Sequence, residues 1–133
     1  MRIRGPWLTA GISAAVLLGV LLATGQEAGA RHPDPRPGIT AQEVLASGEF
    51  PRTPGAAEAY AAARALPDVL DGTYCYCECA RHAGHRSLLT CFESEHGAYC
   101  DVCIEEALTA ARLHREGRSI EDIRQAIDRR FGS

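Results

Sequence analysis

The chain contains no lysine, so its 14 basic residues are all arginines, and 17 acidic residues outnumber them. Nucleic-acid binding depends on clustered positive charges that neutralise phosphates, and the arginines here form no basic stripe. The same charge balance disfavours docking onto anionic lipid headgroups. We therefore expect no nucleic-acid partner.

The first 30 residues lack two export signals: a pair of adjacent arginines, and a cysteine that could accept a lipid. They do contain Arg2 and Arg4, an uncharged run at residues 7–23 and small residues at 28–30, which are the parts of a secretory signal peptide. The run of about 17 residues also reaches the lower limit for a membrane span. We therefore expect residues 1–30 to be a signal peptide or a membrane anchor, with the remainder exported to the periplasm or the extracellular space.

Three segments follow this leader. Prolines at every second position in residues 31–39 favour an extended linker with few hydrogen bonds. Residues 40–66 predict short helices, the first after the capping-box spacing of residues 40–43 and the second in an alanine-rich run that Pro67 ends. Residues 67–133 contain every cysteine and form the cysteine-rich domain.

The end of the chain has a helical pattern. Apolar positions in residues 98–113 recur at helical spacing, and Gly117 suits the left-handed position that follows a helix. Ser119 and Asp122 have N-capping spacing and precede an isoleucine-rich apolar stripe. Because no convincing strand pattern is present, we expect an all-α fold, a small helical domain with a cysteine-rich loop packed on a C-terminal helical hairpin.

Six cysteines lie within residues 75–103, too many for a chance accumulation. They are Cys75, Cys77, Cys79, Cys91, Cys100 and Cys103. An even number of cysteines in an exported chain is typical of a disulfide framework, and 6 thiols allow 15 pairings. In an extended strand, neighbouring cysteines of C-x-C would lie about 6.6 Å apart on one side, which strains a direct disulfide. Pairing of the first three cysteines with the last three stays sterically open.

Sulfur donors that face one way are also the ligands that Cu(I) and Zn prefer. A single zinc ion uses four ligands, so six sulfurs indicate either a bridged cluster of Cu(I) ions or four ligands with two free thiols. His82, His85 and His96 lie in the same region, either as additional ligands or as solvent-exposed loop residues. The expected metal ligands are the six cysteines with these three histidines as additions, and the expected cofactor is copper(I) or zinc.

A third use of the cysteines is thiol–disulfide exchange. Cys100 and Cys103 form a C-x-x-C pair at the predicted start of a helix, where the pKa of the first thiol would be lowered. Asp101 opposes a thiolate there, and the βαβ pattern of thioredoxins is missing. Because neither a phosphate loop nor a recognisable triad is present, we expect a non-enzymatic protein, with exchange chemistry as the alternative.

The remaining titratable residues give weaker signals. Four glutamates are interpreted as solvated: Glu93, Glu95, Glu105 and Glu106. His114 is expected to complement the dipole at a helix C-terminus, and His32 in the linker carries no signal.

Residues 74–79, which read Tyr-Cys-Tyr-Cys-Glu-Cys, resemble the PCYCGC-motif family of small exported bacterial proteins and lipoproteins. The resemblance covers residues 67–132 and includes the C-x-x-C pair. Tyr74 stands where proline is usual in the family, and Glu78 stands where glycine is usual. The lipid-acceptor cysteine of many relatives is missing. The family's function is unassigned, so the resemblance implies the domain without its activity.

A second, weaker likeness lies at residues 116–123 and 130–132, which look like the end of the thiol-bearing cytochrome c maturation proteins. Our leading hypothesis is an exported protein that carries, stores or senses a soft metal ion. Its expected partners are that metal ion and another exported metal- or thiol-handling protein. The alternatives are a thiol oxidoreductase or apocytochrome chaperone, and a disulfide-stapled structural module.

Overall fold

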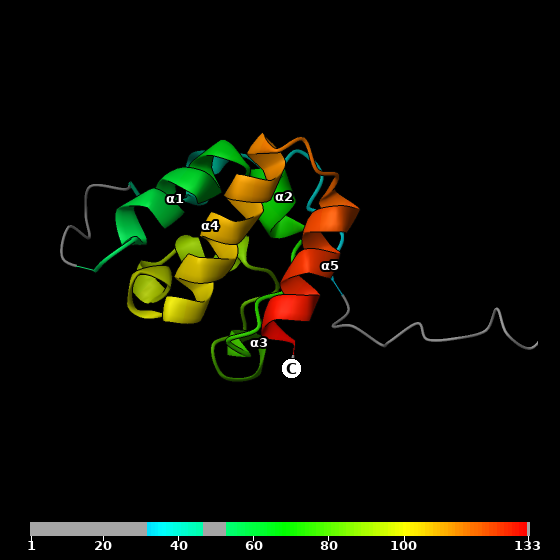
Figure 1. Ribbon diagram of the computed structural model, residues 1–133. Helices are drawn as coiled ribbons and strands as arrows, with labels where there is room; N and C mark the ends of the chain where they lie inside the picture. Colours follow the sequence, from blue (N-terminus) through cyan, green and yellow to red (C-terminus); the bar gives the residue numbers. More distant parts are fainter. Residues whose placement is uncertain (1–31, 47–52, 133) are drawn as a thin grey trace, which may run out of the picture.

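The structure is a computed structural model that describes residues 32–46 and 53–132, and within these ranges it contains helices and no strand (Figure 1). The five α-helices are α1 (Ala56–Ala65), α2 (Pro67–Asp71), α3 (Cys79–His82), α4 (Asp101–Arg115) and α5 (Ile120–Phe131). Three short 3-10 helices are η1 (Ala41–Glu43), η2 (Leu89–Phe92) and η3 (Glu95–Tyr99). The predicted all-α class is confirmed.

The expected leader, including its apolar run at residues 7–23, lies outside the described residues. Within the described part of the chain, no helix has both the length and the apolar character needed to cross a membrane.

Helix α4 runs through the middle of the domain and packs against α1 on one side and α5 on the other (Figure 1). The buried face of α1 consists largely of alanines, among them Ala59 and Ala63, which allow two helices to approach closely. Gly55, at the start of α1, lies so near that an added Cβ would meet the Ile104 side chain of α4 at 3.0 Å. The small side chains of α1 therefore explain its close packing on α4.

The helical hairpin of α4 and α5 forms as its sequence predicts. Gly117 follows α4 with φ +77°, and the adjacent Arg118 N–H donates to the Leu113 carbonyl at 3.1 Å. Ser119 then caps α5, because its side chain accepts from the Asp122 N–H while the Asp122 carboxylate accepts from the Ser119 N–H. These two caps reverse the chain so that α5 packs against α4. Ile123 and Ile127 of α5 are completely buried.

Two elements differ from the sequence-based expectation. Pro67 ends α1 but also begins α2, since proline is well suited to the first helical position. The capping-box spacing of residues 40–43 produces only the three-residue η1, in which the Thr40 hydroxyl accepts from the Gln42 N–H.

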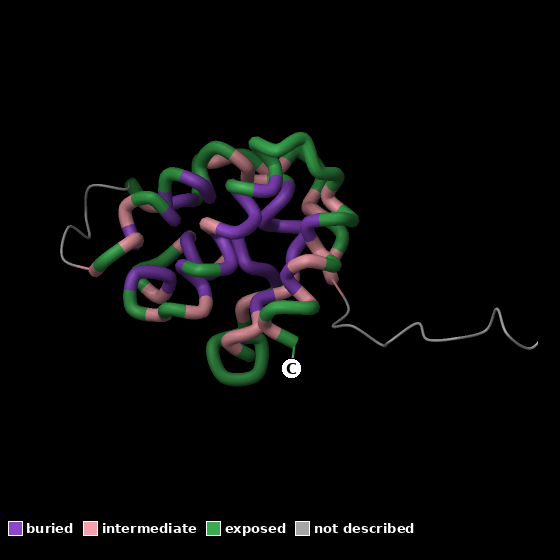
Figure 2. Tube along the Cα trace, in the orientation of Figure 1, coloured by how far each residue is buried: buried purple, intermediate pink, exposed green. Residues whose placement is uncertain are grey.

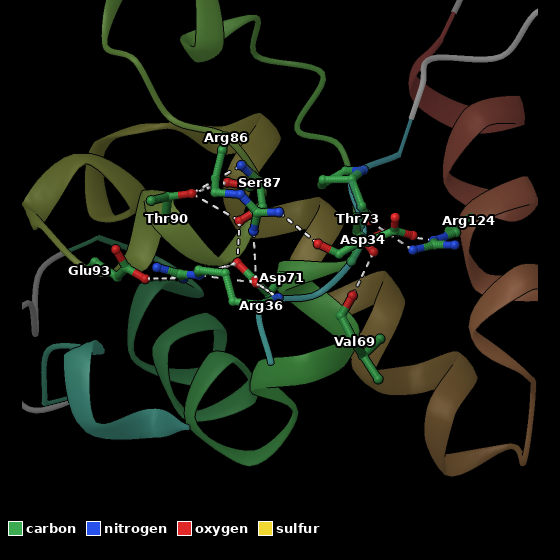
Figure 3. A network of polar contacts seen from close by, with 12 residues as sticks. Asp34, Arg36, Val69, Asp71, Thr73, Arg86, Ser87, Thr90, Glu93 and Arg124 are labelled. Atoms are coloured by element: carbon green, nitrogen blue, oxygen red, sulfur yellow. Dashed lines mark hydrogen bonds and ion pairs between the residues drawn. The ribbon is translucent and has the colours of Figure 1, made fainter. Parts of the chain in front are cut away.

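Residues 32–36 are extended, as their prolines predict, but they are bonded to the domain rather than poor in hydrogen bonds. The Asp71 carboxylate is completely buried and accepts from the Arg36 backbone N–H at 2.7 Å and from the Arg36 guanidinium at 3.0 Å (Figure 3). Arg86 and Ser87 donate to the same carboxylate at 2.8 Å each. The buried carboxylate thus accepts from four donor groups, and its bonds to Arg36 hold residues 32–36 against the helices.

Candidate metal centre

The C-x-C-x-C segment forms a turn, so the strand spacing that argued against a direct disulfide does not apply. The Glu78 N–H donates to the Cys75 carbonyl at 3.4 Å, and Glu78 adopts the left-handed conformation with φ +58°. Because the chain turns here, Cys75 Sγ and Cys77 Sγ lie 3.3 Å apart instead of the strand spacing. The left-handed conformation also gives a physical reason why glycine suits this position.

Short helices bring a second pair of thiols together. Cys79 begins α3, and Cys91 lies in η2, after the half-exposed loop of residues 83–86. Their Sγ atoms are 3.3 Å apart, and both side chains are buried. Cys91 is completely buried next to Phe92, so η2 fixes this thiol inside the core.

The start of α4 supplies the last two thiols. Cys100 is the residue just before the helix, and Cys103 faces the interior from the first turn. Cys103 Sγ lies 3.5 Å from Cys75 Sγ and 3.5 Å from Cys77 Sγ. The C-x-x-C pair therefore joins the C-x-C-x-C turn rather than forming a separate centre.

His96 is the histidine that the fold brings into contact with a thiol. Its Nε2 lies 3.8 Å from Cys77 Sγ, and its backbone N–H donates to the Ser94 hydroxyl, which caps η3. The next residue, Gly97, packs so closely that an added Cβ would meet the Phe92 ring at 2.7 Å. Only glycine permits this approach of η3 to η2, and that approach brings His96 to the cluster.

Seven donors combine into three overlapping sets of four, and within each set all ligand atoms lie within 4.8 Å of one another. The sets are Cys75, Cys77, Cys91 and Cys103; Cys77, Cys79, Cys91 and His96; and Cys77, His96, Cys100 and Cys103. Cys77 belongs to all three sets. We call these six cysteines and His96 the thiol cluster. All six predicted cysteine ligands belong to it, and the cysteines are free thiols in the structure.

The other two predicted histidines lie beside the thiol cluster but belong to none of its donor sets. The His85 ring contacts the His96 ring edge-to-face with centroids 4.7 Å apart, and the His82 ring centroid is 6.5 Å from that of His96. His82 is exposed, whereas His85 is half-buried. Burial, and then the neighbouring His96, lower the pKa of His85 and favour the neutral imidazole that binds metals.

The thiols of the cluster differ in acidity because they face one another. Cys77 accepts S–H bonds from Cys103 and Cys75, and these donors hold the pKa of Cys77 far below its ordinary value. The pKa of Cys75 is raised, because Cys103 and Cys77 both favour its protonated form. Burial raises the pKa of Cys79 to about 12 and also raises that of Cys100. The negative charge therefore concentrates on Cys77, and the expected lowering at Cys100 by the start of α4 is wrong.

Glu106 lies against the thiol cluster, and its burial was not predicted from the sequence. It is completely buried, and its Oε1 accepts from the Tyr76 N–H at 2.9 Å. Burial raises the pKa of this carboxyl to about 7. The interpretation of Glu106 as part of a solvated face is wrong, whereas its neighbour Glu105 is exposed. Glu106 follows Cys103 by three residues, and this helical spacing was the available signal.

Two buried side-chain atoms have no hydrogen-bond partner among the described residues, Glu106 Oε2 and His85 Nδ1. Buried polar atoms are nearly always hydrogen-bonded, so such exceptions are informative. One belongs to a side chain beside Cys75, and the other to a ring that contacts His96. Both exceptions therefore border the thiol cluster.

His32 and α5 hold the cysteine turn in place, so the expectation that His32 carries no signal is wrong. His32 Nδ1 accepts from the Tyr74 N–H at 3.0 Å, and its Nε2 donates to Asp128 at 2.8 Å. The Tyr76 hydroxyl donates to the same carboxylate at 2.6 Å. These bonds fix both tyrosines that flank Cys75. His114 is exposed in the last turn of α4, where it was expected.

The spacing of the sulfur atoms matches that of ligands around one ion. Four thiolates at about 2.3 Å from a tetrahedral ion would lie about 3.8 Å apart. The measured Sγ–Sγ distances are 3.3 Å and 3.5 Å, so the donors are already gathered to within a few tenths of an ångström of that spacing. The cluster could hold a metal ion through soft sulfur donors and one imidazole.

A family model described as "Protein of unknown function with PCYCGC motif" matches residues 41–133 of the chain. Neither the curated proteins nor the solved structures include a significant match. The matched region contains the whole thiol cluster and all five α-helices.

Proposed function

The chain belongs to the PCYCGC-motif family of unknown function, and from the geometry of its thiol cluster we propose that it binds soft metal ions, Cu(I) or Zn. If the first 30 residues direct export, the protein carries, stores or senses this metal outside the cytoplasm. Binding itself requires no chemical step, so the proposed protein is not an enzyme.

The convergence of all donors on one place carries the proposal. A disulfide framework needs only one neighbour for each cysteine, and the pairs could lie anywhere in the domain. Here Cys77 contacts Cys75, Cys103 and His96, and it shares donor sets with the remaining three cysteines. Many neighbours for one sulfur are what coordination and bridging require. Glu106 Oε2 and His85 Nδ1, which have no hydrogen-bond partner among the described residues, provide further potential ligand atoms at the border of the thiol cluster.

The overlap of the donor sets favours more than one ion. If a single ion occupied one set of four, three of the seven donors would remain without a metal. Ions in adjacent sets would share Cys77, and a thiolate can bridge two soft ions. Several cations would also balance the charge of six thiolates in a buried place, where uncompensated charge is costly. A bridged Cu(I) cluster meets these conditions, because soft thiolates are the ligands that Cu(I) prefers.

Thiol–disulfide exchange is the second candidate, and one observation favours it. Cys77 is half-buried, its pKa is strongly lowered by the Cys103 and Cys75 thiols, and Cys75 lies 3.3 Å away as a resolving thiol. This nucleophile differs from the expected Cys100. Exchange would oxidise Cys75 and Cys77 to a disulfide and reduce a disulfide in a substrate protein.

Metal analysis with thiol titration separates the candidates. The protein is purified without oxygen, and bound metals and reactive thiols are counted before and after strong chelation. We expect stoichiometric copper or zinc, with thiols that become reactive only after the metal is removed. Three disulfides without metal would leave the structural module. A single readily reduced disulfide, without metal, would support exchange.

Two variants refine the measurement. Cys77→Ser removes the donor common to all three sets, whereas Cys100→Ser removes a half-buried member of only one. We expect Cys77→Ser to lower the metal count more than Cys100→Ser does. Equal counts in both variants would contradict the shared role of Cys77.

A further inference from the structure

Building on the proposed metal site, we propose that His82, His85 and His96 form a path of imidazoles through which soft metal ions reach and leave the buried thiols. The path begins at exposed His82 and ends at the contact between His96 and Cys77. We call these three residues the histidine path.

The burial of the thiols makes a path necessary. Cys75, Cys79, Cys91 and Cys103 are buried, with exposed fractions of 4% or less, whereas Cys77 and Cys100 are half-buried. An ion from solvent therefore cannot meet most of the sulfur donors directly. Cys77 offers access, and it is the thiol that His96 contacts at 3.8 Å.

Exposure decreases along the three rings towards that contact. His82 lies in α3 and is exposed, together with residues 80–84 around it. His85 and His96 are half-buried, and their rings meet with centroids 4.7 Å apart. The exposed loop that carries α3 projects from the end of the molecule near the C-terminus of α5 (Figures 1 and 2). The outer end of the histidine path is thus open to an incoming carrier protein.

His85 carries an independent sign of a ligand. Its Nδ1 is buried and has no hydrogen-bond partner among the residues that the structure describes. A buried imidazole nitrogen without a partner loses its hydration and gains nothing in return, unless it binds something transiently. A ring nitrogen next to His96 would gain a bond whenever an ion passes from His82 towards Cys77.

The chemistry of the ligands suits stepwise transfer. Imidazole binds both Cu(I) and Zn, but thiolates bind soft ions more strongly, so an ion gains affinity as it moves inward. In each step one metal–nitrogen bond breaks as a bond to the next donor forms, with no change of oxidation state. A donor carrier is released when His82 and His85 have replaced its ligands. The partner class is therefore another metal-carrying protein that presents its ion at an exposed site.

Transfer kinetics test the histidine path. The variant His82→Ala/His85→Ala is compared with His114→Ala, which removes an exposed imidazole about 20 Å further along α4 from Cys100. Each protein is loaded with Cu(I) without oxygen, and metal transfer to a coloured Cu(I) chelator is followed by stopped flow. The reverse reaction starts from a weak Cu(I) complex. Metal per chain is counted for each variant at equilibrium.

We expect the double variant to bind the same number of ions as the unchanged protein but to exchange them about tenfold more slowly, a change of about 1.4 kcal/mol in the barrier. His114→Ala should leave both quantities unchanged. Unchanged rates in the double variant would overturn the path and point to access beside Cys100. A lower metal count would also overturn it, because His82 or His85 would then be a resident ligand. If the unchanged protein binds no metal, the proposed function itself fails.

Discussion

Two buried polar clusters lie close together along the chain and differ in how their groups are satisfied. The Asp71 cluster is complete, because arginine and serine donors from two segments surround one carboxylate (Figure 3). The hydrogen-bond partners of the thiol cluster are mainly its own thiols and His96, with one bond from Cys91 to the Ser87 carbonyl, and the unpartnered atoms of Glu106 and His85 border it. In the Asp71 cluster the protein itself supplies the hydrogen-bond partners, whereas the thiol cluster can still accept a ligand.

The electrostatics show the same difference. Burial alone would raise the pKa of Asp71, yet the bonds from Arg36, Ser87 and Arg86 lower it, so the carboxylate stays charged. The main causes of the cysteine pKa shifts are burial and the neighbouring thiols, and most of these shifts favour the protonated form. The charged Asp71 carboxylate therefore needs no bound ion, whereas full ionisation of the thiols requires added positive charge.

The largest expected effect comes from removing the carboxylate of the Asp71 cluster. Asp71→Ala should lower the free energy of unfolding by about 3 kcal/mol, the lower end for a broken buried pair, because Arg36 and Arg86 are partly exposed and can be hydrated. The loss should be the same with and without metal, since the cluster is complete in both states. Urea denaturation of both forms measures it.

Asp68→Ala is the matched control, because Asp68 lies on the exposed side of the same short helix. It should change the free energy of unfolding by less than about 1 kcal/mol. A loss in Asp71→Ala that disappears on metal binding would contradict the independence of the two clusters.

The next effect concerns pH. The folded pKa of Cys79 is raised to about 12 by burial, so above its unfolded pKa the unfolded chain releases a proton that the folded chain retains. Stability of the reduced, metal-free protein should therefore fall as pH rises from about 9 to 12, by at most about 1.4 kcal/mol per pH unit for this thiol. Because the chain has no lysine, the other groups that titrate there are mainly the remaining cysteines and the tyrosines.

Tyr60 acts in the same direction, since burial raises its pKa to about 12. Urea midpoints measured at several pH values for the unchanged protein and for Cys79→Ser isolate the contribution of Cys79, because the variant should show a shallower decline. Identical slopes would show that Cys79 does not retain its proton in the folded state.

The smallest effect concerns the turn that gathers the thiols. Glu78 has φ +58°, a conformation that costs a residue with a side chain about 1–2 kcal/mol. Glu78→Gly removes this strain, but glycine gives the unfolded chain more conformational entropy, which costs the folded state about 0.5–1 kcal/mol. We therefore expect the free energy of unfolding to rise by about 0.5 kcal/mol. Thermal unfolding measures the gain, and Glu78→Ala, which keeps a Cβ, should show none. A gain in both variants would indicate that backbone strain is not the cause.

The sequence predicts the helical hairpin well because its signals are local. Gly117 and Ser119 act through their own backbone and side-chain bonds, so spacing alone reveals them. The docking of residues 32–36 was not predictable in this way, because Arg36 and Asp71 lie 35 positions apart and meet only after the chain has folded. Asp71 precedes Gly72, and an Asp-Gly pair is typical of a turn, so this local pattern gives no sign of a buried carboxylate.

The candidate site was predictable in its members and not in its arrangement. All six cysteines were expected ligands, and they converge. The choice of His96 over His82 and His85 depends on Gly97, which lets η3 pack against Phe92. The turn at Glu78 brings Cys75 and Cys77 closer together than an extended strand would. Tertiary packing therefore decides which nitrogen meets a sulfur, and no local pattern contains that information.

The most direct test of the central claim, that soft donors converge on an ion, is X-ray absorption at the edge of the bound metal. We expect a first shell dominated by sulfur at about 2.3 Å, with a minor nitrogen contribution that decreases in His96→Ala. Bridged ions would add a metal–metal contribution beyond this shell. A first shell of light atoms alone, or a protein that retains no metal to measure, would contradict the account.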